Sequence, residues 1–134
     1  QGPLPTTLII WNFPAPLTPA HVLEVWPADG CMDYIEIPYD ASEMRFKGFI
    51  IANFMTPDLA QAFQRDWNMQ VTSGWHHEPL DIRPARFQGL RHLLVRYKNK
   101  DIERLRRRGH LPLLFDSDGR RMNTAAELRL RFPP

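Results

Sequence analysis

The sequence contains only one cysteine, Cys31, among 134 residues. A single cysteine forms neither an intrachain disulfide framework nor a thiolate cage for a metal ion, and low cysteine use favours a reducing compartment. No apolar run is long enough to span a bilayer, and no basic start with an apolar centre and a small-residue cleavage site marks a signal peptide. We therefore expect an intracellular protein, located in the nucleus or the cytoplasm, that does not associate with a membrane.

The sequence is also poor in catalytic signatures. It has no glycine-rich phosphate loop and no G-x-S-x-G elbow, and no sequence-evident base accompanies Cys31. His76-His77-Glu78 resembles a metal-ligand cluster, but adjacent histidines diverge in a strand or a helix, and no third ligand follows at a known spacing. We therefore expect a protein that is not an enzyme and that holds neither a metal ion nor a cofactor.

Positive charge is scarce in the first part of the sequence and abundant in the second. Residues 1–78 contain three Lys or Arg and nine Asp or Glu, a net charge of −6, whereas residues 79–134 contain fourteen and six, a net charge of +8. This asymmetry indicates that the basic C-terminal part meets a polyanion and that the N-terminal part supplies the scaffold. The alternative is that the basic residues only form a solvated helix face.

Local patterns predict an alternation of strands and helices in the first two thirds of the chain. Thr18-Pro19 and Thr56-Pro57 each place a capping side chain before a proline at the first helical position, and apolar residues recur at helical spacing after both. β-branched and aromatic runs with period-two alternation predict the strands. The expected elements are a strand over 7–13, a helix over 19–26, strands over 32–38 and 47–54, a helix over 57–67, and a strand over 80–87 in which Pro84 indicates a sheet edge.

This order, β-α-β-β-α-β, predicts an α+β protein with the ferredoxin-like fold. In that fold one four-stranded antiparallel sheet is backed by two helices and keeps one face open. With 43% apolar residues, the chain can bury a single core. We therefore expect one domain over 6–88. Gln1-Gly2-Pro3 resembles the remnant of a cleaved tag and is excluded from this prediction.

The pattern becomes helical again beyond Gly89. Apolar spacing predicts helices near 90–97 and 102–108, a short strand within 110–115 and a last helix over 124–131. We expect residues 89–134 to form a basic C-terminal extension packed on the same domain. The helix over 90–97 either lies across the open sheet and closes it or packs beside the sheet and enlarges it.

One segment carries a specific motif. Residues 47–54, Lys-Gly-Phe-Ile-Ile-Ala-Asn-Phe, match the strand K/R-G-F/Y-G/A-F-V-x-F/Y of an RNA recognition motif with two positions altered. Alternation along the strand puts Lys47, Phe49 and Ile51 on the face away from the core. RNA recognition motifs stack bases on aromatic rings laid on the sheet, and Phe49 and Ile51 occupy the two stacking positions of this strand. The motif therefore predicts a module that binds single-stranded RNA with an incomplete aromatic platform.

The first strand lacks the third stacking ring. In its six-residue motif, Ile9 stands where the usual motif has an aromatic residue. Because base stacking on an aromatic ring contributes about 1 to 3 kcal/mol per base, other rings must compensate. Alternation places Trp11 on the same open face as Ile9, and we expect Trp11 to be presented together with Tyr34 and Phe49. Glu36 is also expected on that face, where it would repel phosphate.

Three further segments match a narrower pattern. Residues 6–14 are similar to a T-T-L-M-I-x-N-I-P opening, residues 38–48 match the spacing of a loop that leads into V-G-Y-A-F-I-N-F, and residues 85–89 are similar to A-R-I-Q-G followed by an additional helix. These motifs resemble the C-terminal RNA recognition motif of the Mei-two-like family of meiosis and development regulators. The sequence departs from the family at Ile50 and Ile51.

The resemblance implies single-stranded RNA as the ligand and a role in post-transcriptional regulation. The resemblance and the sheet pattern together predict a set of RNA-binding residues: Ile9, Trp11, Asn12, Tyr34, Lys47, Phe49, Ile51, Arg83 and Arg86. Among these, Asn12 is implied to make a side-chain contact. Arg83 and Arg86, near the end of the fourth strand, are placed to meet a neighbouring nucleotide.

The basic extension adds candidate phosphate contacts and leaves one rival function. The candidates are Arg104, Arg106, Arg107 and Arg108. They point in too many helical directions for one face, so at most two or three of them touch one strand of phosphates. The rival is a protein-binding variant of the RNA recognition motif, in which a peptide or a partner protein binds the sheet or the helices and RNA binds weakly or not at all.

Overall fold

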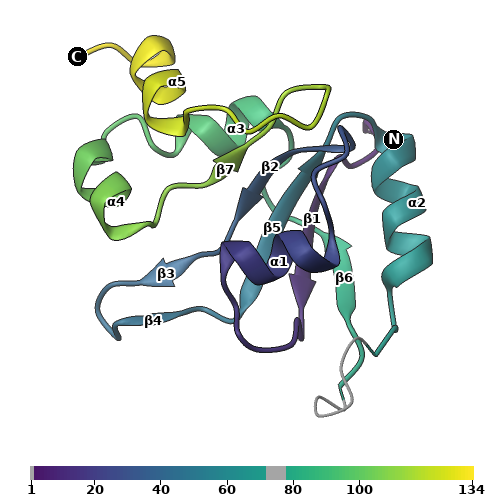
Figure 1. Cartoon of the computed structure of the whole chain (residues 1–134). Helices are drawn as coiled ribbons and strands as arrows, with labels where there is room; N and C mark the ends of the chain where they lie inside the picture. The colour runs from purple at the N-terminus through teal and green to yellow at the C-terminus, as the bar shows by residue number, and fades with distance from the viewer. Residues whose placement is uncertain (1, 72–77) are drawn as a thin grey trace.

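A five-stranded antiparallel sheet organises the protein, whose computed structural model describes residues 2–71 and 78–134 (Figure 1). The sheet has the strand order β6-β1-β5-β2-β7. Its strands are β1 (Thr7–Trp11), β2 (Met32–Glu36), β5 (Phe49–Phe54), β6 (Asp81–Pro84) and β7 (Leu113–Leu114). The first four have the connectivity and order predicted for the ferredoxin-like fold, and the α+β class is confirmed. The histidine pair considered above as a metal site lies outside the described residues.

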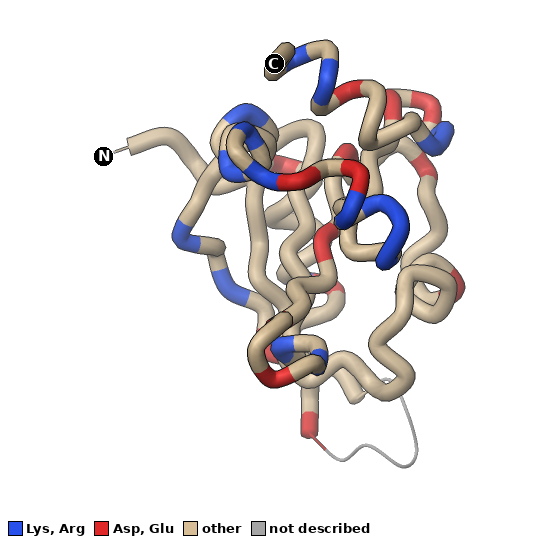
Figure 2. The backbone as a smooth tube through the Cα atoms, turned by 90° about the vertical axis from the view of Figure 1, so that its left-hand side faces the viewer, with Lys and Arg blue, Asp and Glu red and all other residues tan. Residues whose placement is uncertain are grey.

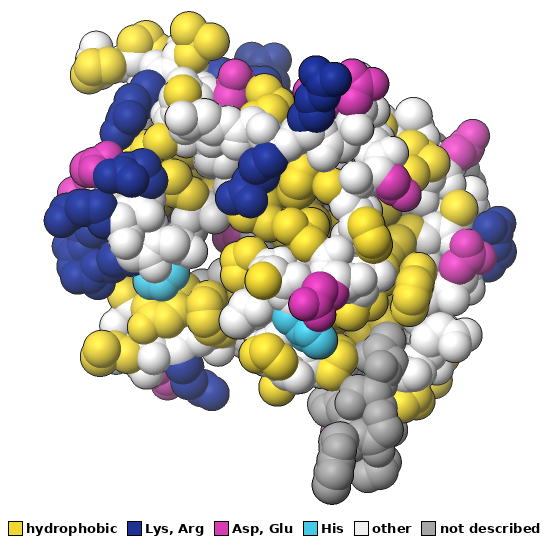
Figure 3. All heavy atoms as spheres, in the orientation of Figure 1, with side chains coloured by type: hydrophobic (Ala, Val, Ile, Leu, Met, Phe, Trp, Pro, Cys, Tyr) yellow, Lys and Arg dark blue, Asp and Glu magenta, His cyan; other side chains and the backbone are white. Residues whose placement is uncertain are grey.

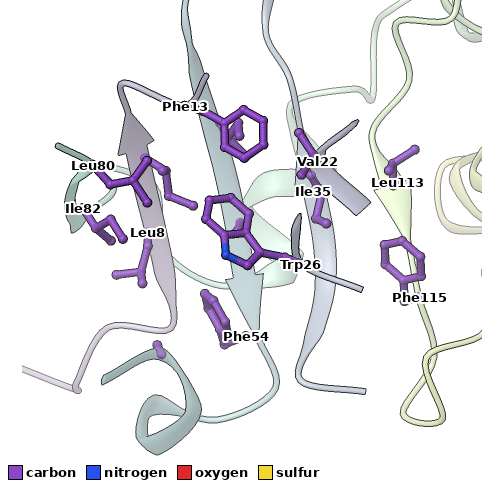
Figure 4. Packing of buried hydrophobic residues seen from close by; sticks show 14 residues of the cluster. Leu8, Phe13, Val22, Trp26, Ile35, Phe54, Leu80, Ile82, Leu113 and Phe115 are labelled. Atoms are coloured by element: carbon purple, nitrogen blue, oxygen red, sulfur yellow. The ribbon is translucent and has the colours of Figure 1, made fainter. Parts of the chain in front are cut away.

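Two helices pack on one face of this sheet, as the sequence predicts. α1 (Pro19–Val25) and α2 (Pro57–Trp67) each begin with a proline in the first turn, and the hydroxyls of Thr18 and Thr56 accept hydrogen bonds from the backbone amides of the first turn at 3.2 Å. Figure 4 shows the core beneath them, where Trp26 and Phe54 lie among aliphatic side chains from β1, β2 and β6. The period-two alternation of the strands therefore gives this face its core.

A short hairpin lies between β2 and β5, within the 38–48 segment that matches the spacing of a loop. Its strands are β3 (Tyr39–Asp40) and β4 (Arg45–Phe46). The rings of Tyr39 and Phe46 meet edge to face at 5.2 Å, and Tyr39 also stacks on His110 at 4.0 Å between ring centroids. These contacts attach the hairpin to the C-terminal extension, a long-range interaction that local sequence patterns do not reveal.

The C-terminal extension, residues 89–134, contains the predicted helices and strand. They are α3 (Leu90–Val95), α4 (Ile102–Arg108), β7 and α5 (Thr124–Arg131). β7 pairs with β2, so the sheet has five strands where the sequence predicted four. The extension also packs against the sheet face opposite α1 and α2, where a second apolar cluster forms from Tyr34, Leu93, Leu94, Tyr97, Leu114 and Leu128. The extension thus both enlarges the sheet and covers the β2 side of its second face.

A glutamine fixes the path of the chain from β6 into α3. The side-chain oxygen of Gln88 accepts hydrogen bonds from the backbone amides of Thr6 and Thr7 at 3.0 and 2.9 Å, and its nitrogen donates to the carbonyls of Thr7 and Ala85 at 2.8 Å. The amide of Gly89 donates to the buried hydroxyl of Thr7 at 2.8 Å. Because these bonds tie the chain to the start of β1, α3 must begin above that end of the sheet.

The turn before β2 touches the extension backbone so closely that only glycine fits. A Cβ atom built on Gly30 would lie 2.4 Å from the carbonyl oxygen of Ser117, and Gly30 has a φ of +94°. Gly48 has a similar φ of +92° with no atom within 4 Å of the same position. Gly48→Ala should therefore cost only the backbone strain, on the order of 1 to 2 kcal/mol. Gly30→Ala should cost about 1 to 3 kcal/mol more, because the neighbouring backbone has to move.

Urea denaturation of the two glycine variants measures this difference. Equal destabilisation by Gly30→Ala and Gly48→Ala would mean that the extension does not approach the turn as closely in solution as the structure shows. Hydrogen exchange at Ser117 and Gly119 provides a local check, since the amide of Gly119 donates to Asp116 in the same turn.

Candidate nucleic-acid interface

The second face of the sheet is partly uncovered over β6, the later part of β1 and the earlier part of β5, whereas Thr7 and Asn53 on the same face are buried. Its side chains follow from the strand register, which pairs Trp11 with Phe49, and Ile9 with both Ile51 and Arg83. We call these five residues the open strip. Ile51 lies at the boundary of the strip, since it packs partly against the second apolar cluster. Extension helices occupy the neighbouring half of the face, so the strip is narrower than a complete four-stranded surface.

Two aromatic rings lie next to each other in the open strip. Trp11 is 38% exposed and Phe49 is partly exposed, and their ring centroids lie 4.7 Å apart with the planes tilted by 47°. Both rings point away from α1 and α2, which confirms the orientation that strand alternation predicts for them. A partly exposed ring on a sheet is the kind of surface on which an unpaired base stacks.

Basic residues recur along the chain from β6 to α3, where Figure 2 marks Lys and Arg in blue on the backbone. The Nε of Arg83 contacts the Oδ1 of Asp81 at 2.9 Å, and this hydrogen bond and charge raise the pKa of Arg83. Arg83, Arg86 and Lys47 are all exposed. A phosphate can therefore approach each of these cations, although at Arg83 it competes with Asp81.

Tyr34 is not part of the exposed surface, and the expectation that it lies open beside Trp11 and Phe49 is wrong. It is fully buried beneath the extension, in the cluster that includes Leu93 and Leu94. Its hydroxyl donates a hydrogen bond to the Oε1 of Glu36 at 2.5 Å. Burial, with the nearby Tyr97 and Glu36, raises the pKa of Tyr34, so the phenol stays protonated. Its ring supports the extension instead of a base.

Glu36 also differs from the expectation, because it does not face RNA as a free carboxylate. Glu36 is 7% exposed, and both of its oxygens are bound by Arg96 of the extension, at 2.9 and 3.2 Å. Burial alone would lower the pKa of Arg96, but the hydrogen bonds and charge of Glu36 raise it above its usual value. The repulsion that the sequence predicts for phosphate is therefore neutralised inside the protein.

Asn12 has a local structural partner. Its backbone has a φ of +70°, and its Nδ2 donates a hydrogen bond to the carbonyl of Pro79 at 3.0 Å. This bond ties the end of β1 to the segment that leads into β6. Contact between the Asn12 side chain and RNA remains a prediction.

Sequence reasoning missed one exposed aromatic residue near the strip. Phe87 is 48% exposed, and the guanidinium carbons of Arg86 and Arg96 lie 5.7 and 5.6 Å from the centroid of its ring. The contact with Arg96 places Phe87 next to the buried ion pair of Glu36. The sequence gave little indication that Phe87 is exposed, because the fourth strand was expected to continue to Phe87. In the structure β6 ends at Pro84.

The arginines of α4 fall into two groups. Arg106 pairs with Glu103, which also contacts Arg129 at 3.2 Å, and these arginines lower the pKa of Glu103 to about 2. Within the described ranges, no ion-pair partner is found for the exposed Arg104, Arg107 and Arg108, whose side chains are therefore available for other contacts. α4 lies beyond the β2 side of the sheet, across the extension from the open strip (Figure 1). An RNA can contact both the open strip and the α4 arginines only if it passes over the extension.

Two other classes of site are absent from the described part of the chain. None of its helices is long and apolar enough to cross a membrane. Over residues 2–71 and 78–134, no three His, Cys, Asp or Glu side chains converge in an arrangement suited to a metal ion.

Comparison with solved structures identifies the fold. The RRM of RNA15 aligns with a TM-score of 0.51 and 17% identity over 63% of this chain and 92% of that one. The second RRM domain of yeast poly(U)-binding protein (Pub1) aligns with a TM-score of 0.50 and 16% identity over 59% of this chain and 92% of that one. Sex-lethal in its complex with RNA aligns with a TM-score of 0.52 and 20% identity over 64% of this chain and 50% of that one.

These structural similarities show that the protein has the fold of an RNA recognition motif. No protein-family model and no curated protein sequence matches the chain. The aligned share, between 59 and 64% of the chain in the three comparisons, leaves room for an additional structural part of the size of the C-terminal extension.

Proposed function

We propose that the protein is a module that binds single-stranded RNA on the open strip. The observation that carries this proposal is the pair of neighbouring rings, Trp11 and Phe49, on the uncovered half of the sheet. Arg83 in the same strip and the exposed Arg86 and Lys47 supply positive charge at its margins. Rings flanked by cations suit unpaired nucleotides, since the bases stack and the phosphates pair with arginine or lysine.

The width of the strip limits what it can hold. With Tyr34 and Glu36 covered by the extension, the rings of Trp11 and Phe49 form one stacking platform, and Ile9 and Ile51 form an aliphatic floor beside it. We expect about two nucleotides to lie on the sheet itself. One base stacks on the rings and its neighbour packs over the isoleucines.

The proposal also includes a family relationship and a cellular role. The motifs around residues 6–14 and 85–89 support a relationship with Mei-two-like RNA regulators. The Pub1 domain, whose name states that it binds poly(U), and the Sex-lethal complex, which contains RNA, support RNA as the ligand class. We infer a binding role without catalysis, in post-transcriptional regulation inside the cell, in the nucleus or the cytoplasm.

Titration with labelled RNA tests the proposal. Fluorescence polarisation should show saturable binding of a random-sequence single-stranded octamer and weaker binding of a duplex of the same length, because a duplex cannot lay its bases on the rings. In parallel, NMR should show shifts of the Trp11 indole and the Ile9 and Ile51 methyl signals. Absence of saturable binding, or shifts confined to α1 and α2, would rule out RNA recognition by the sheet.

The α4 arginines should contribute only to the binding of longer RNA. For a hexamer, replacing Arg104, Arg107 and Arg108 with alanine should leave the slope of log K against log salt unchanged, since the strip lies across the extension from α4. For a long single strand, the slope should become shallower by about 0.7 for each arginine that contacts a phosphate. Arg65→Ala on α2 serves as the charge control. An unchanged slope with the long RNA would exclude these arginines from the interface.

A further inference from the structure

A hollow on the opposite side of the molecule is not used by the proposed RNA site. It lies between the end of α1 and α2, on the face that carries both helices, and has a volume of about 310 Å³. Its apolar walls come from Val25, Trp26, Met32, Phe54, Phe63 and Trp67. Figure 3 shows hydrophobic side chains gathered on the surface between these two helices. We call this feature the helix-face hollow.

Aromatic rings define the shape of the hollow. The Trp26 ring meets Phe63 at 5.0 Å and Trp67 at 5.7 Å, in both cases edge to face. Trp26 and Phe54 are only 5% and 2% exposed, so the floor of the hollow is formed by side chains of the core. Edge-to-face aromatic contacts extend readily to one more ring, and a hollow of this size accommodates one large side chain.

The two charged residues in the described lining of the hollow are both acidic. Asp29 and Asp66 lie in its lining. Across α1 and α2, Arg65 is the only Lys or Arg, and it pairs with its neighbour Asp66 at 3.1 Å. Glu24 on α1 adds a further exposed carboxylate. The C-terminal part of the chain, in contrast, carries the net charge of +8. A basic ligand is therefore attracted to the helix face, whereas RNA is attracted to the sheet and the extension.

We infer that the helix-face hollow binds a short basic peptide segment of a partner protein, which inserts one large aromatic side chain. Charge complementarity selects a peptide over nucleic acid, because the described residues of the lining include the carboxylate of Asp29 and the Arg65-paired carboxylate of Asp66 but no Lys or Arg. The inserted ring packs against Trp26, Phe63 and Trp67. The protein thus has two binding faces, one for RNA and one for a basic peptide, separated by the sheet.

A labelled model peptide tests this inference directly. The probe is a fluorescein-labelled peptide of arginines around one central tryptophan, and its controls replace the tryptophan with alanine or the arginines with glutamate. The tryptophan-containing basic peptide should bind saturably, and both controls should bind at least about tenfold more weakly. Equal binding of the alanine control would overturn the inference, since it would show charge attraction without insertion into the hollow.

Two variants locate the peptide on the protein. Trp67→Ala should weaken peptide binding about tenfold and leave RNA binding unchanged, because it removes one wall of the hollow. Asp66→Lys, at an exposed position of α2, should weaken peptide binding about threefold. Trp11→Ala on the sheet is the matched control and should not change peptide affinity. Peptide binding that is insensitive to both Trp67→Ala and Asp66→Lys would overturn the inference.

The single cysteine gives a measurement on the unmodified protein. Cys31 lines the hollow, and burial together with Asp29 raises the pKa of its thiol. Saturating peptide should slow alkylation by N-ethylmaleimide about fivefold or more, whereas saturating RNA should not. Unchanged alkylation with bound peptide would contradict insertion.

Sedimentation without peptide adds a further test: a dimer that Trp67→Ala dissociates would show that the hollow binds a second copy and would overturn the peptide assignment.

Discussion

Replacing both Trp11 and Phe49 with alanine should weaken single-stranded RNA binding by roughly 30- to 150-fold, as expected from losing about 2 to 3 kcal/mol of stacking. The two rings are neighbours in the register and touch each other at 4.7 Å, so each single variant still leaves one ring on the platform. Each single replacement should therefore cost less than half of the binding free energy that the double replacement costs. Fluorescence polarisation at constant salt measures all three variants.

Matched controls separate stacking from general damage. Trp11→Phe keeps a ring at the same position and should retain most of the affinity. Trp67→Ala removes an aromatic ring of equal size from the helix face and should leave RNA binding unchanged. If the double alanine variant melts like wild type and still binds RNA with wild-type affinity, the open strip is not the RNA site.

The second large effect concerns the ion pair that holds the extension on the sheet. Arg96→Met should destabilise the protein by about 3 kcal/mol, near the lower end of the range for breaking a buried pair, since Arg96 retains some access to water. The reason is that Glu36 would keep its charge in a site where it is 7% exposed and where Tyr34 is its remaining hydrogen-bond partner. Urea denaturation measures the loss.

A second substitution tests whether the unpaired carboxylate causes this loss. Glu36→Gln added to Arg96→Met should recover a substantial part of the stability, because an uncharged amide costs less to bury. Arg91→Met, at an exposed position of α3, the helix whose C-cap is Arg96, is the control and should change stability little. A loss for Arg91→Met as large as that for Arg96→Met would indicate damage to α3 itself and not to the ion pair.

Release of the extension should also be visible locally. In Arg96→Met, amide protons of α3 should exchange faster than those of β5, because fewer interactions hold the helix on the sheet while the central strand keeps both neighbours. Equal protection of α3 in the variant and in wild type would show that apolar contacts of Leu93 and Leu94 suffice to hold it.

Local patterns predicted the elements because their causes are local. The Thr-Pro pairs at 18–19 and 56–57 cap helices through their own first turns, and period-two alternation assigns each strand residue to one face. Trp11 and Phe49 were placed correctly for this reason. The same logic failed at Tyr34, because alternation states which face a side chain is on but not whether another element covers that face.

The candidate site was therefore only partly predictable. The open strip required knowledge of where the extension docks, and docking depends on pairs that lie far apart in the sequence. Arg96 binds Glu36 across 60 positions, and Leu114 pairs with Tyr34 across the new sheet edge. Phe87 was missed because its exposure depends on where β6 ends and on the guanidinium of Arg96.

The amino-acid sequence by itself determined the order of the strands and helices other than the β3–β4 hairpin, the face of the sheet on which a strand side chain lies, and the separation of acidic and basic parts. These follow from periodicity, capping and composition, which act over a few residues. Only the tertiary structure decided how much of the sheet stays uncovered and that a hollow forms between α1 and α2. Both depend on side chains packed between elements that the chain brings together over long distances, where burial and charge pairing select one arrangement.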